Sequence, residues 1–203
     1  MTSTTLFWGI AALILAYLIS AIPCGYLLVR WRTGSDIRSA GSGNIGATNV
    51  LRVGGRGAGL LTLALDMAKG LVSVALARAI TGGDPVWCAG AAFSSVLGHC
   101  YPIYLRWRGG KGIATGCGAY AILAPLPMML TLAVFVVALL LTRMVSVGSI
   151  CAGLALPLLV WWLNPDPALL ISVVAAALLV ITRHRPNIVR ILQGAERRVN
   201  GGA

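Results

Sequence analysis

The sequence predicts an all-α, polytopic integral membrane protein with seven transmembrane helices, and three observations support this fold class. Hydrophobic residues make up 58% of the 203 residues, and charged residues make up only 10%. The mean hydropathy is +0.88, whereas soluble domains rarely contain so little charge. The basic residues are also concentrated in alternate connections between apolar segments, as in polytopic membrane proteins. We expect a single membrane domain over residues 1–203.

The apolar segments define the expected helices in order. A hydrocarbon core about 30 Å thick requires roughly 20 apolar residues per helix. The expected spans are Leu6–Val29, Leu60–Ile80, Val86–Leu105, Ile113–Leu123, Pro127–Leu141, Val147–Leu163 and Ala168–Ile181. The first is too long for a signal-peptide core and has no basic residue before it, so we expect it to be retained. The fourth is the shortest and is rich in glycine, and it decides whether the count is six or seven.

The placement of lysine and arginine supports seven spans and predicts their orientation. The basic connections are 30–56 with five arginines, 106–111 with three basic residues, the turn at Arg143, and the tail from Arg183 with five arginines. The N-terminal "MTSTTLF" and the segments 81–85, 124–127 and 164–167 contain no basic residue. The positive-inside rule then places the N-terminus outside and the C-terminus in the cytoplasm. Without a crossing at 113–123, Arg143 and the basic tail would face outward.

Charge and cysteine usage exclude several classes of function. A net charge of +11 suggests nucleic acid in a soluble protein, but in a membrane protein it reflects cytoplasmic loops and anionic ligands or lipids. We therefore expect no nucleic-acid partner. The five cysteines form no CxxC pair, which argues against a disulfide framework or a zinc site. Bases greatly outnumber acids on the expected cytoplasmic face, so we expect a phosphate or carboxylate ligand, with no metal and no cofactor.

The polar stretch "SAGSGNIGATNVLRVGG" (39–55) lies between the first two expected spans. Its glycines permit positive φ, so we expect backbone amides in 41–55 to form an anion-binding nest. Ser42 and Asn44 add neutral donors, and Arg52 can bind a phosphate or carboxylate with two parallel hydrogen bonds. A topological or lipid-anchoring role for Arg52 is an equal alternative. The terminal "VGG" is expected to be a turn.

The segment "RGGKG" (108–112) places Lys111 between glycines, where its ammonium can meet an anion at close range. A helix beginning at Ile113 would direct free amides at the same anion. The segment is not a Walker A loop, because Gly112 stands where a serine or threonine is required. Lys111 alone would more often be a membrane anchor. His99, beside an apolar run, is expected to be a hydrogen-bonded packing residue.

The segment "RHRPN" (183–187) suits the start of a helix, because Pro186 is favoured in the first turn. Such a helix would place Asn187, Arg190 and Gly194 along one face. A solvated surface histidine is the alternative interpretation of His184. Within the second span, Asp66 and Lys69 are three residues apart and are expected to form an ion pair.

These segments resemble the motifs of a known family. "GSGNIGATNVLR", "GHCYPIYLRWRGGKGIAT" and "RHRPNIVRILQGAE" are similar in order and spacing to the three motifs of the bacterial acyl-phosphate:glycerol-3-phosphate acyltransferases, the PlsY family. "LDMAKG" and "RMVSVGSI" resemble the family as well, so the likeness covers essentially the whole chain. The resemblance implies a seven-helix enzyme of the bacterial inner membrane with its active site at the cytoplasmic face. It also implies transfer of a fatty acyl group from acyl phosphate to the sn-1 hydroxyl of glycerol 3-phosphate, giving lysophosphatidic acid and phosphate, the first step of phospholipid synthesis.

The resemblance further implies the site residues. Active-site positions carry over onto Ser42, Arg52, Lys111, Ser149, His184, Asn187 and Glu196, with Ser146 as an alternative to Ser149. Gly109, Gly110 and Gly112 are expected to shape the glycerol-phosphate pocket. We assign phosphate binding to Arg52 and Lys111, hydrogen-bond donation to the serines, and orientation of the glycerol backbone to the residues of the last motif. The general base stays open between His184 and a phosphate oxygen of the substrate.

The expected partners are glycerol 3-phosphate, fatty acyl phosphate and membrane lipid, with no obligate protein partner. The rival function is a small-anion transporter or channel. A transporter would spread polar groups through the depth of the membrane and would show an internal repeat. Here polarity is confined to one face and no convincing repeat is present, which disfavours the rival.

Overall fold

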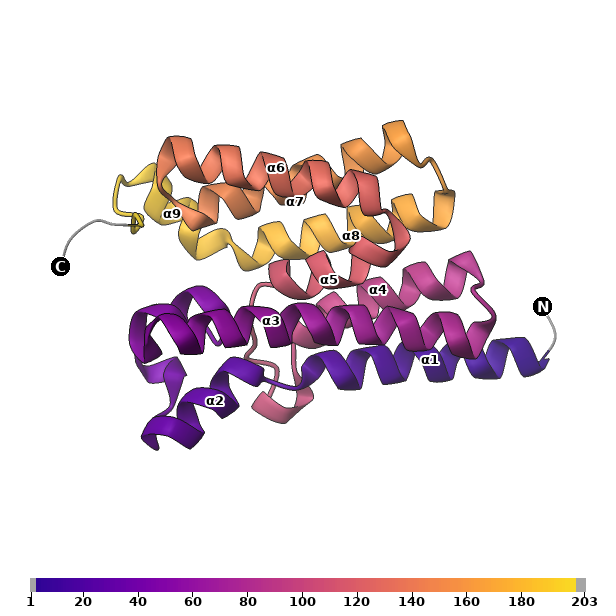
Figure 1. The fold of residues 1–203 in the computed structure, drawn as a ribbon, viewed down its shortest axis with the longest axis horizontal. Coiled ribbons are helices and arrows are strands. Elements are labelled where there is room, and N and C mark those ends of the chain that lie inside the picture. The colour runs from indigo at the N-terminus through magenta and orange to yellow at the C-terminus, as the bar shows by residue number, and fades with distance from the viewer. Residues whose placement is uncertain (1–2, 200–203) are drawn as a thin grey trace. The chain divides into compact units, whose positions relative to one another are not determined.

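The computed structural model describes residues 3–199, and every regular element in that range is helical. The α-helices are α1 (Ser3–Ala21), α2 (Cys24–Thr33), α3 (Ala47–Thr81), α4 (Pro85–Cys100), α5 (Ile113–Leu123), α6 (Pro125–Thr142), α7 (Val145–Leu163), α8 (Pro167–Arg183) and α9 (Arg185–Leu192). Two short 3-10 helices, η1 (Ile37–Ser39) and η2 (Ile103–Leu105), lie in the connections. The expected all-α fold class is confirmed for this part of the chain (Figure 1).

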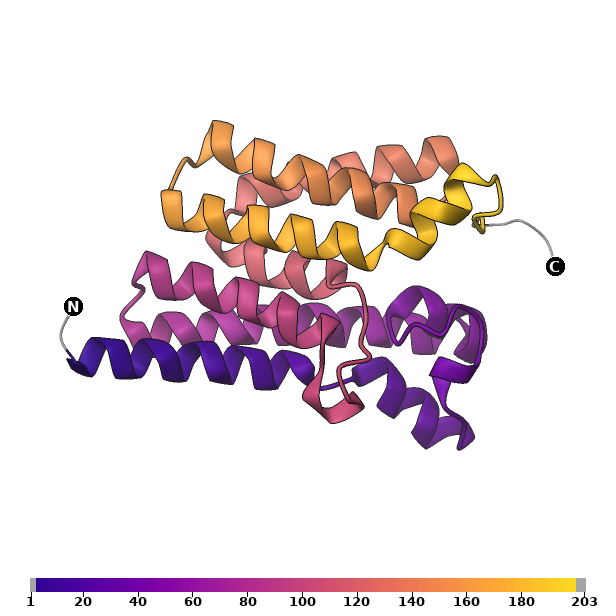
Figure 2. The same ribbon diagram turned by 180° about the vertical axis from the view of Figure 1, so that it is seen from behind.

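The helices form two compact units, one ending at Leu123 and the other beginning at Ala124. In the first unit, α1 packs against α3 and α4, and α5 packs against the same two helices. In the second unit, α7 packs against both α6 and α8, and α9 follows α8. Figures 1 and 2 show the long helices within each unit running side by side.

Small residues let the helices of the first unit approach closely. A buried cluster between α1, α3 and α4 consists of Ala12, Ala16, Ala77 and Ala91. A Cβ atom added at Gly70 of α3 would collide with the carbonyl oxygen of Thr115 in α5. One added at Gly118 of α5 would collide with the carbonyl oxygen of Met67. Close backbone contact through small residues is typical of membrane helix pairs.

The first apolar segment consists of two helices, which together form one candidate span, Ser3–Thr33, around the expected span Leu6–Val29. α1 ends at Ala21 and α2 begins at Cys24. Pro23 lies between them, and proline both lacks an amide hydrogen and disfavours helical conformation in the residue before it.

A buried ion pair stabilises this break. The ammonium of Lys69 donates a 2.9 Å hydrogen bond to the Ile22 carbonyl oxygen, which the break leaves outside the helical pattern. The same ammonium lies 2.9 Å from a carboxylate oxygen of Asp66, and both side chains are buried. The predicted Asp66–Lys69 pair is therefore confirmed.

α3 is much longer than the expected second span. It begins at Ala47, inside the polar stretch 39–55, and continues for 35 residues. Gly55 interrupts it with non-helical φ and ψ, and at 1.5 Å per residue the part after Gly55, residues 56–81, is about 39 Å long, above the roughly 30 Å of a hydrocarbon core. The expected turn at "VGG" is confirmed, because Gly55 has φ 83° and ψ 174° between the two helical parts of α3, residues 47–54 and 56–81.

The third and fourth expected spans correspond to short helices. α4 ends at Cys100, five residues before the expected Leu105, because Pro102 interrupts the helix. α5 has 11 residues and is about 16 Å long. Four helical segments within residues 3–199 are long and apolar enough to cross a membrane, or five if α8 and α9 count as one bent span. A count of seven crossing helices stays a prediction.

The second unit is a helical hairpin extended by a bent helix. α6 and α7 approach closely, since Gly148 of α7 has no room for a side chain beside the Phe135 backbone. α8 and α9 form a bent pair with an angle of 56°. The bend falls at His184, between the two helices, and Pro186 lies in the first turn of α9. The predicted helix start at Pro186 is therefore confirmed.

Candidate active site

The first polar loop is organised by Asn49, at the start of α3. Its amide nitrogen donates hydrogen bonds to the carbonyl oxygens of Asn44 at 2.9 Å and Ala40 at 3.1 Å. Its amide oxygen accepts a 2.8 Å hydrogen bond from the backbone amide of Ser42. Asn49 is 1% exposed, and a Cβ atom at Gly41 would collide with its side chain. One buried side chain therefore determines the conformation of the loop.

The glycines of this loop adopt the predicted positive φ, with values of 63° at Gly41 and 71° at Gly43. The amides around them are nevertheless used within the loop. The amide of Gly43 donates to the Ala40 carbonyl, and that of Gly46 donates to the side-chain oxygen of Asn44 at 2.8 Å. With the Ser42 amide bonded to Asn49, the predicted anion nest is wrong for these three donors, because the loop satisfies them itself.

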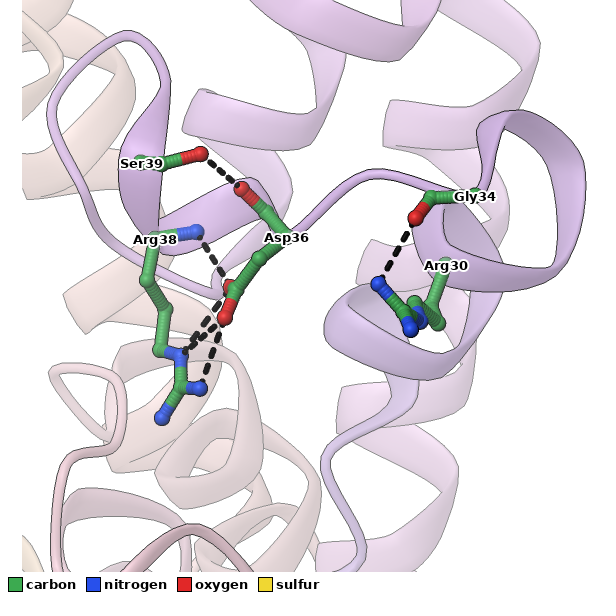
Figure 3. Close-up of polar contacts among 5 residues, drawn as sticks. All are labelled: Arg30, Gly34, Asp36, Arg38 and Ser39. Carbon is green, nitrogen blue, oxygen red and sulfur yellow. Dashed lines mark hydrogen bonds and ion pairs between the residues drawn. The ribbon is translucent and has the colours of Figure 1, made fainter.

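An ion pair anchors the N-terminal side of the loop (Figure 3). The guanidinium of Arg38 donates to both carboxylate oxygens of Asp36, at 2.7 to 3.1 Å. The hydrogen bonds from Arg38 hold the pKa of the Asp36 carboxyl below its ordinary value. Figure 3 also shows the Arg30 side chain turned onto the Gly34 carbonyl oxygen, at 2.7 Å. Arg30 and Arg38 thus both make contacts within this part of the chain.

The two candidate residues of the first loop are on its open side. Ser42 and Arg52 are both exposed, and Arg52 lies in the second turn of α3. Their positions leave both side chains accessible to an anion in solution or at a membrane surface.

The second loop, 101–112, turns through η2 and returns to α5 (Figure 2). The amide of Gly110 donates a 3.0 Å hydrogen bond to the carbonyl oxygen of His99. A Cβ atom at Gly109 would collide with that carbonyl, and one at Gly110 would collide with the His99 ring. Gly112 has φ 84°. All three glycines are therefore required by the packing and conformation of the loop itself, whether or not they also contact a ligand.

Lys111 lies directly before α5, and the predicted helix start at Ile113 is confirmed. Its side chain is half-buried. The first backbone amides of a helix have no partner within the helix and carry partial positive charge. The end of this loop therefore combines a lysine with a helix N-terminus, which is an arrangement suited to an anion.

The candidate residues of the second unit meet at Glu196. One carboxylate oxygen accepts hydrogen bonds from the Ser146 hydroxyl at 2.8 Å and the Asn187 amide at 2.7 Å. The other accepts from Nε of Arg190 at 2.8 Å. Burial raises the pKa of Glu196, but the hydrogen bonds from Asn187, Ser146 and Arg190 outweigh it and the pKa lies below its ordinary value. Glu196 is therefore an ionised acceptor that holds three other side chains.

A glycine turn brings Glu196 back onto α9. The amide of Ala195 bonds the Arg190 carbonyl, and that of Gly194 bonds the Ile191 carbonyl, which together form a Schellman motif. Gly194 has φ 68°. The prediction that Gly194 lies on one helix face with Asn187 and Arg190 is wrong, because α9 ends at Leu192 and Gly194 reverses the chain.

His184 is buried between α8 and α9, so the alternative of a solvated histidine is wrong. Its side chain is 1% exposed, and Nδ1 lies 2.8 Å from the Val180 carbonyl oxygen. A carbonyl can only accept, so Nδ1 carries the proton. In the neutral imidazole, Nε2 is then the unprotonated nitrogen and can accept a proton.

The structure distinguishes the two candidate serines of α7. The Ser146 hydroxyl donates its proton to Glu196. Ser149 lies three residues further along the same helix and is also buried, so the two share one face. Only Ser146 belongs to the cluster around Glu196.

Some organising residues were not identified as such from the sequence. The role of Asn49 depends on loop carbonyls that a sequence does not place together. The position of His99 against Gly110 was likewise not foreseen, although a histidine eleven residues before the second glycine of "RGG" was visible. Within residues 3–199, no group of three or more His, Cys, Asp or Glu side chains is placed to hold a metal ion.

Comparisons with known proteins agree on one family. The family described as "Glycerol-3-phosphate acyltransferase" matches residues 10–194. The chain is 47% identical over 186 residues to the glycerol-3-phosphate acyltransferase of Syntrophotalea carbinolica, covering 92% of this chain and 95% of that one. It is 44% identical over 207 residues to the enzyme of the same name from Thermosynechococcus vestitus, covering 97% of both chains.

Two solved structures are also similar to the chain. Both are crystal structures of PlsY, an integral membrane glycerol 3-phosphate acyltransferase. The glycerol 3-phosphate form matches with a TM-score of 0.90 and 34% identity, over 95% of this chain and 96% of that one. The lysophosphatidic acid form matches with a TM-score of 0.87 and 33% identity, over 95% of both chains.

Proposed function

Since the chain belongs to the glycerol-3-phosphate acyltransferase family, we propose that it transfers a fatty acyl group from acyl phosphate to the sn-1 hydroxyl of glycerol 3-phosphate. Membership makes it an integral membrane acyltransferase of phospholipid synthesis. The observation that carries the proposal is the similarity, over 95% of the chain, to a PlsY structure in its glycerol 3-phosphate form. The rival function of a small-anion transporter is not favoured by any of these relatives.

The proposed reaction needs no covalent enzyme intermediate, because acyl phosphate is an activated mixed anhydride. The sn-1 oxygen attacks the acyl carbonyl carbon, a new C–O ester bond forms, and the bond from that carbon to the phosphate oxygen breaks. Phosphate leaves, and the hydroxyl proton passes to a base. The protein has to position two anions and stabilise the negative charge that develops on the carbonyl oxygen and the leaving group.

Arg52 and Lys111 are the proposed phosphate-binding residues. Arg52 is exposed on α3, and a guanidinium can bind a phosphate through two parallel hydrogen bonds. Lys111 adjoins the N-terminus of α5, where backbone amides add to its positive charge. Ser42 is a further donor from the first loop, and Gly109, Gly110 and Gly112 leave the positions around Lys111 without side chains.

The second unit supplies the proposed polar residues that act on glycerol 3-phosphate. Glu196 is a positioning residue, since its lone pairs are occupied by Ser146, Asn187 and Arg190. Ser149 is the proposed substrate-binding serine, because the Ser146 hydroxyl already donates its proton to Glu196. His184 is a proposed general base, since its protonated Nδ1 leaves Nε2 as an acceptor. A phosphate oxygen of the substrate is the alternative base.

We further propose seven transmembrane helices with the N-terminus outside, the C-terminus in the cytoplasm, and the active site at the cytoplasmic face of the bacterial inner membrane. Support comes from the basic residues of 30–56, 106–111 and the tail. Tags at the two termini of the full chain, probed with an impermeant protease in oriented vesicles, measure the orientation. Cleavage of both tags from the same side would contradict an odd number of spans.

One assay tests the function. The purified chain in lipid vesicles receives acyl phosphate and glycerol 3-phosphate, and phosphate release and lysophosphatidic acid are measured together. We expect equal amounts of both products from the chain alone, since no protein partner is proposed. Turnover with acyl-CoA but not with acyl phosphate would overturn the proposed donor. Uptake of phosphate into vesicles without any lysophosphatidic acid would favour the transporter.

A further inference from the structure

We infer that Asp66 and His99 are positioning residues for the loop 106–112, which carries Lys111. The inference deepens the proposed function and rests on it, because it assigns these two side chains a role in the binding of glycerol 3-phosphate. Neither of them has a role in the reaction described so far.

His99 packs directly against the glycine-rich loop. Its carbonyl oxygen accepts the Gly110 amide at 3.0 Å. Its imidazole occupies the space where a side chain at position 110 would lie, and its carbonyl occupies the corresponding space at position 109. The residue is 4% exposed. Backbone and ring of one residue thus contact the two glycines that directly precede Lys111.

Asp66 lies behind the imidazole. Its carboxylate oxygen is 3.7 Å from Nδ1 of His99, a distance for electrostatic contact rather than a hydrogen bond. The same oxygen is 2.9 Å from the Lys69 ammonium, and all three side chains are buried. A continuous contact path therefore runs from α3 through Asp66 and His99 to Gly110, one residue before Lys111.

A structural role alone does not explain this arrangement. Lys69 already neutralises Asp66 and bonds the Ile22 carbonyl at the break between α1 and α2. An apolar side chain at position 99 would fill the same volume without bringing a second polar group, in addition to the Lys69 ammonium, to a buried carboxylate. What the imidazole adds is an orientation set by Asp66, and the loop packs on that orientation.

Displacement of this loop is expected to weaken the binding of one substrate more than that of the other. Lys111 binds a substrate phosphate in the proposed function, and its neighbouring glycines are expected to shape the glycerol-phosphate pocket, so we assign Lys111 to the phosphate of glycerol 3-phosphate. A displaced binding group that acts equally in the ground state and the transition state raises KM while kcat changes little. A displacement of about 1 Å is sufficient for large losses in such sites.

The test compares His99→Leu with Ser95→Ala, a control one turn earlier on α4. Ser95 is fully buried and its hydroxyl bonds the Ala92 carbonyl of its own helix at 2.8 Å. We expect His99→Leu to raise KM for glycerol 3-phosphate about tenfold and to leave KM for acyl phosphate within about twofold. Ser95→Ala should lower thermal stability without changing either KM. Reduced stability of His99→Leu with an unchanged KM would overturn the inference.

Asp66 needs a variant that preserves charge balance. Asp66→Asn alone leaves Lys69 as an unpaired buried charge and invites misfolding. The double variant D66N/K69M removes both charges. If Asp66 orients His99, the double variant folds and shows the same raised KM for glycerol 3-phosphate as His99→Leu. A folded double variant with wild-type KM would remove Asp66 from the path.

Two further measurements address the contact itself. Gly110→Ala should reduce kcat/KM because the new Cβ atom collides with the His99 ring. Removal of the ring by His99→Ala should relieve that collision. The double variant H99A/G110A should therefore have the same kcat/KM as His99→Ala alone. Additive losses would contradict the contact. Hydrogen–deuterium exchange of a peptide covering 106–112 should be faster in His99→Leu than in wild type and unchanged in Ser95→Ala. This measurement does not depend on turnover, so an inactive wild-type enzyme would refute the proposed function, whereas unchanged exchange would refute the inference.

Discussion

Glu196→Gln is the substitution that most directly tests the polar cluster of the second unit. The carboxylate accepts hydrogen bonds from Ser146 (2.8 Å), Asn187 (2.7 Å) and Arg190 (2.8 Å). Glutamine keeps the shape but replaces one acceptor oxygen by an NH2 donor, so at least one of the three donors faces another donor. Hydrogen bonds to charged groups contribute about 1.5–3 kcal/mol each, and we expect the free energy of unfolding to fall by about 2–3 kcal/mol.

The same substitution should reduce activity. Asn187 is held by Glu196 and is proposed to orient glycerol 3-phosphate, so its displacement weakens alignment of the reacting hydroxyl. We expect kcat/KM for glycerol 3-phosphate to fall about 10- to 100-fold. Phosphate release in lipid vesicles measures this loss.

The pH dependence of stability identifies Glu196 as the cause. Its pKa in the folded protein is lowered, because the hydrogen bonds outweigh the effect of burial. A carboxyl with a lowered pKa contributes stability that is complete above its unfolded value of about 4.3 and is lost as the pH falls through the folded value. Wild type should therefore lose stability below about pH 5 more steeply than Glu196→Gln. Denaturant titrations followed by tryptophan fluorescence measure both slopes.

Asp166→Ala is the matched control for this experiment. Asp166 accepts the Leu169 amide at 2.7 Å as the N-cap of α8, and its loss should reduce stability by about 1 kcal/mol. It belongs to the same unit but lies at the start of α8, whereas Glu196 is bonded to α9 and to the start of α7, so kcat/KM should stay unchanged. Equal pH slopes and equal kcat/KM in wild type and Glu196→Gln would refute the reasoning.

Four other substitutions have definite expected outcomes. Gly194→Ala places a Cβ atom at φ 68°, which should reduce the free energy of unfolding by about 1–2 kcal/mol and, by displacing Glu196, lower kcat/KM. Asparagine tolerates this backbone conformation, so Gly194→Asn should lose less in both measurements. Asn49→Ala leaves the bonds from its side chain to the first loop unmade and should reduce thermal stability by about 2–3 kcal/mol; a wild-type melting temperature would contradict this. Lys111→Ala should reduce kcat/KM at least 100-fold, as expected for an uncompensated substrate phosphate, while Arg108→Ala, an exposed cation in the same loop, changes it less than about threefold. His184→Ala should slow single-turnover acyl transfer about 10²- to 10⁴-fold if His184 is the base, and a wild-type rate would leave the substrate phosphate in that role.

The helical class and several helix boundaries could be predicted from the sequence because they depend on local chemistry. Pro186 and Ile113 begin helices as predicted, and Asp66 and Lys69 pair across one helical turn as their spacing indicates. The break at Pro23 was equally local, yet the apolar residues on both sides of it concealed it within one long segment. Hydropathy identifies the apolar residues of a membrane segment, but it does not detect the loss of one backbone amide hydrogen at a proline.

The parts that could not be predicted depend on contacts between distant residues. The amides of the first loop are used by Asn49 and Asn44, so positive φ at glycine did not produce an anion nest. Glycine is required at positions 109 and 110 because His99 occupies the space of a side chain there. The sequence motif alone suggests instead that the ligand requires these glycines. Glu196 reaches its partners only because the chain reverses at Gly194. The helix predicted for the last motif continues through Gly194 and so does not predict this reversal.

The contact of α5 with α3 also couples the position of Lys111 to that of a much longer helix. A helix of 11 residues is too short to find its own level by matching the hydrocarbon thickness. Gly70 and Gly118 bring the two backbones together at two points along their length, which prevents axial sliding of α5. The axial position of Lys111 is therefore linked to that of α3. A displacement of α3 along its axis would therefore be transmitted to the lysine.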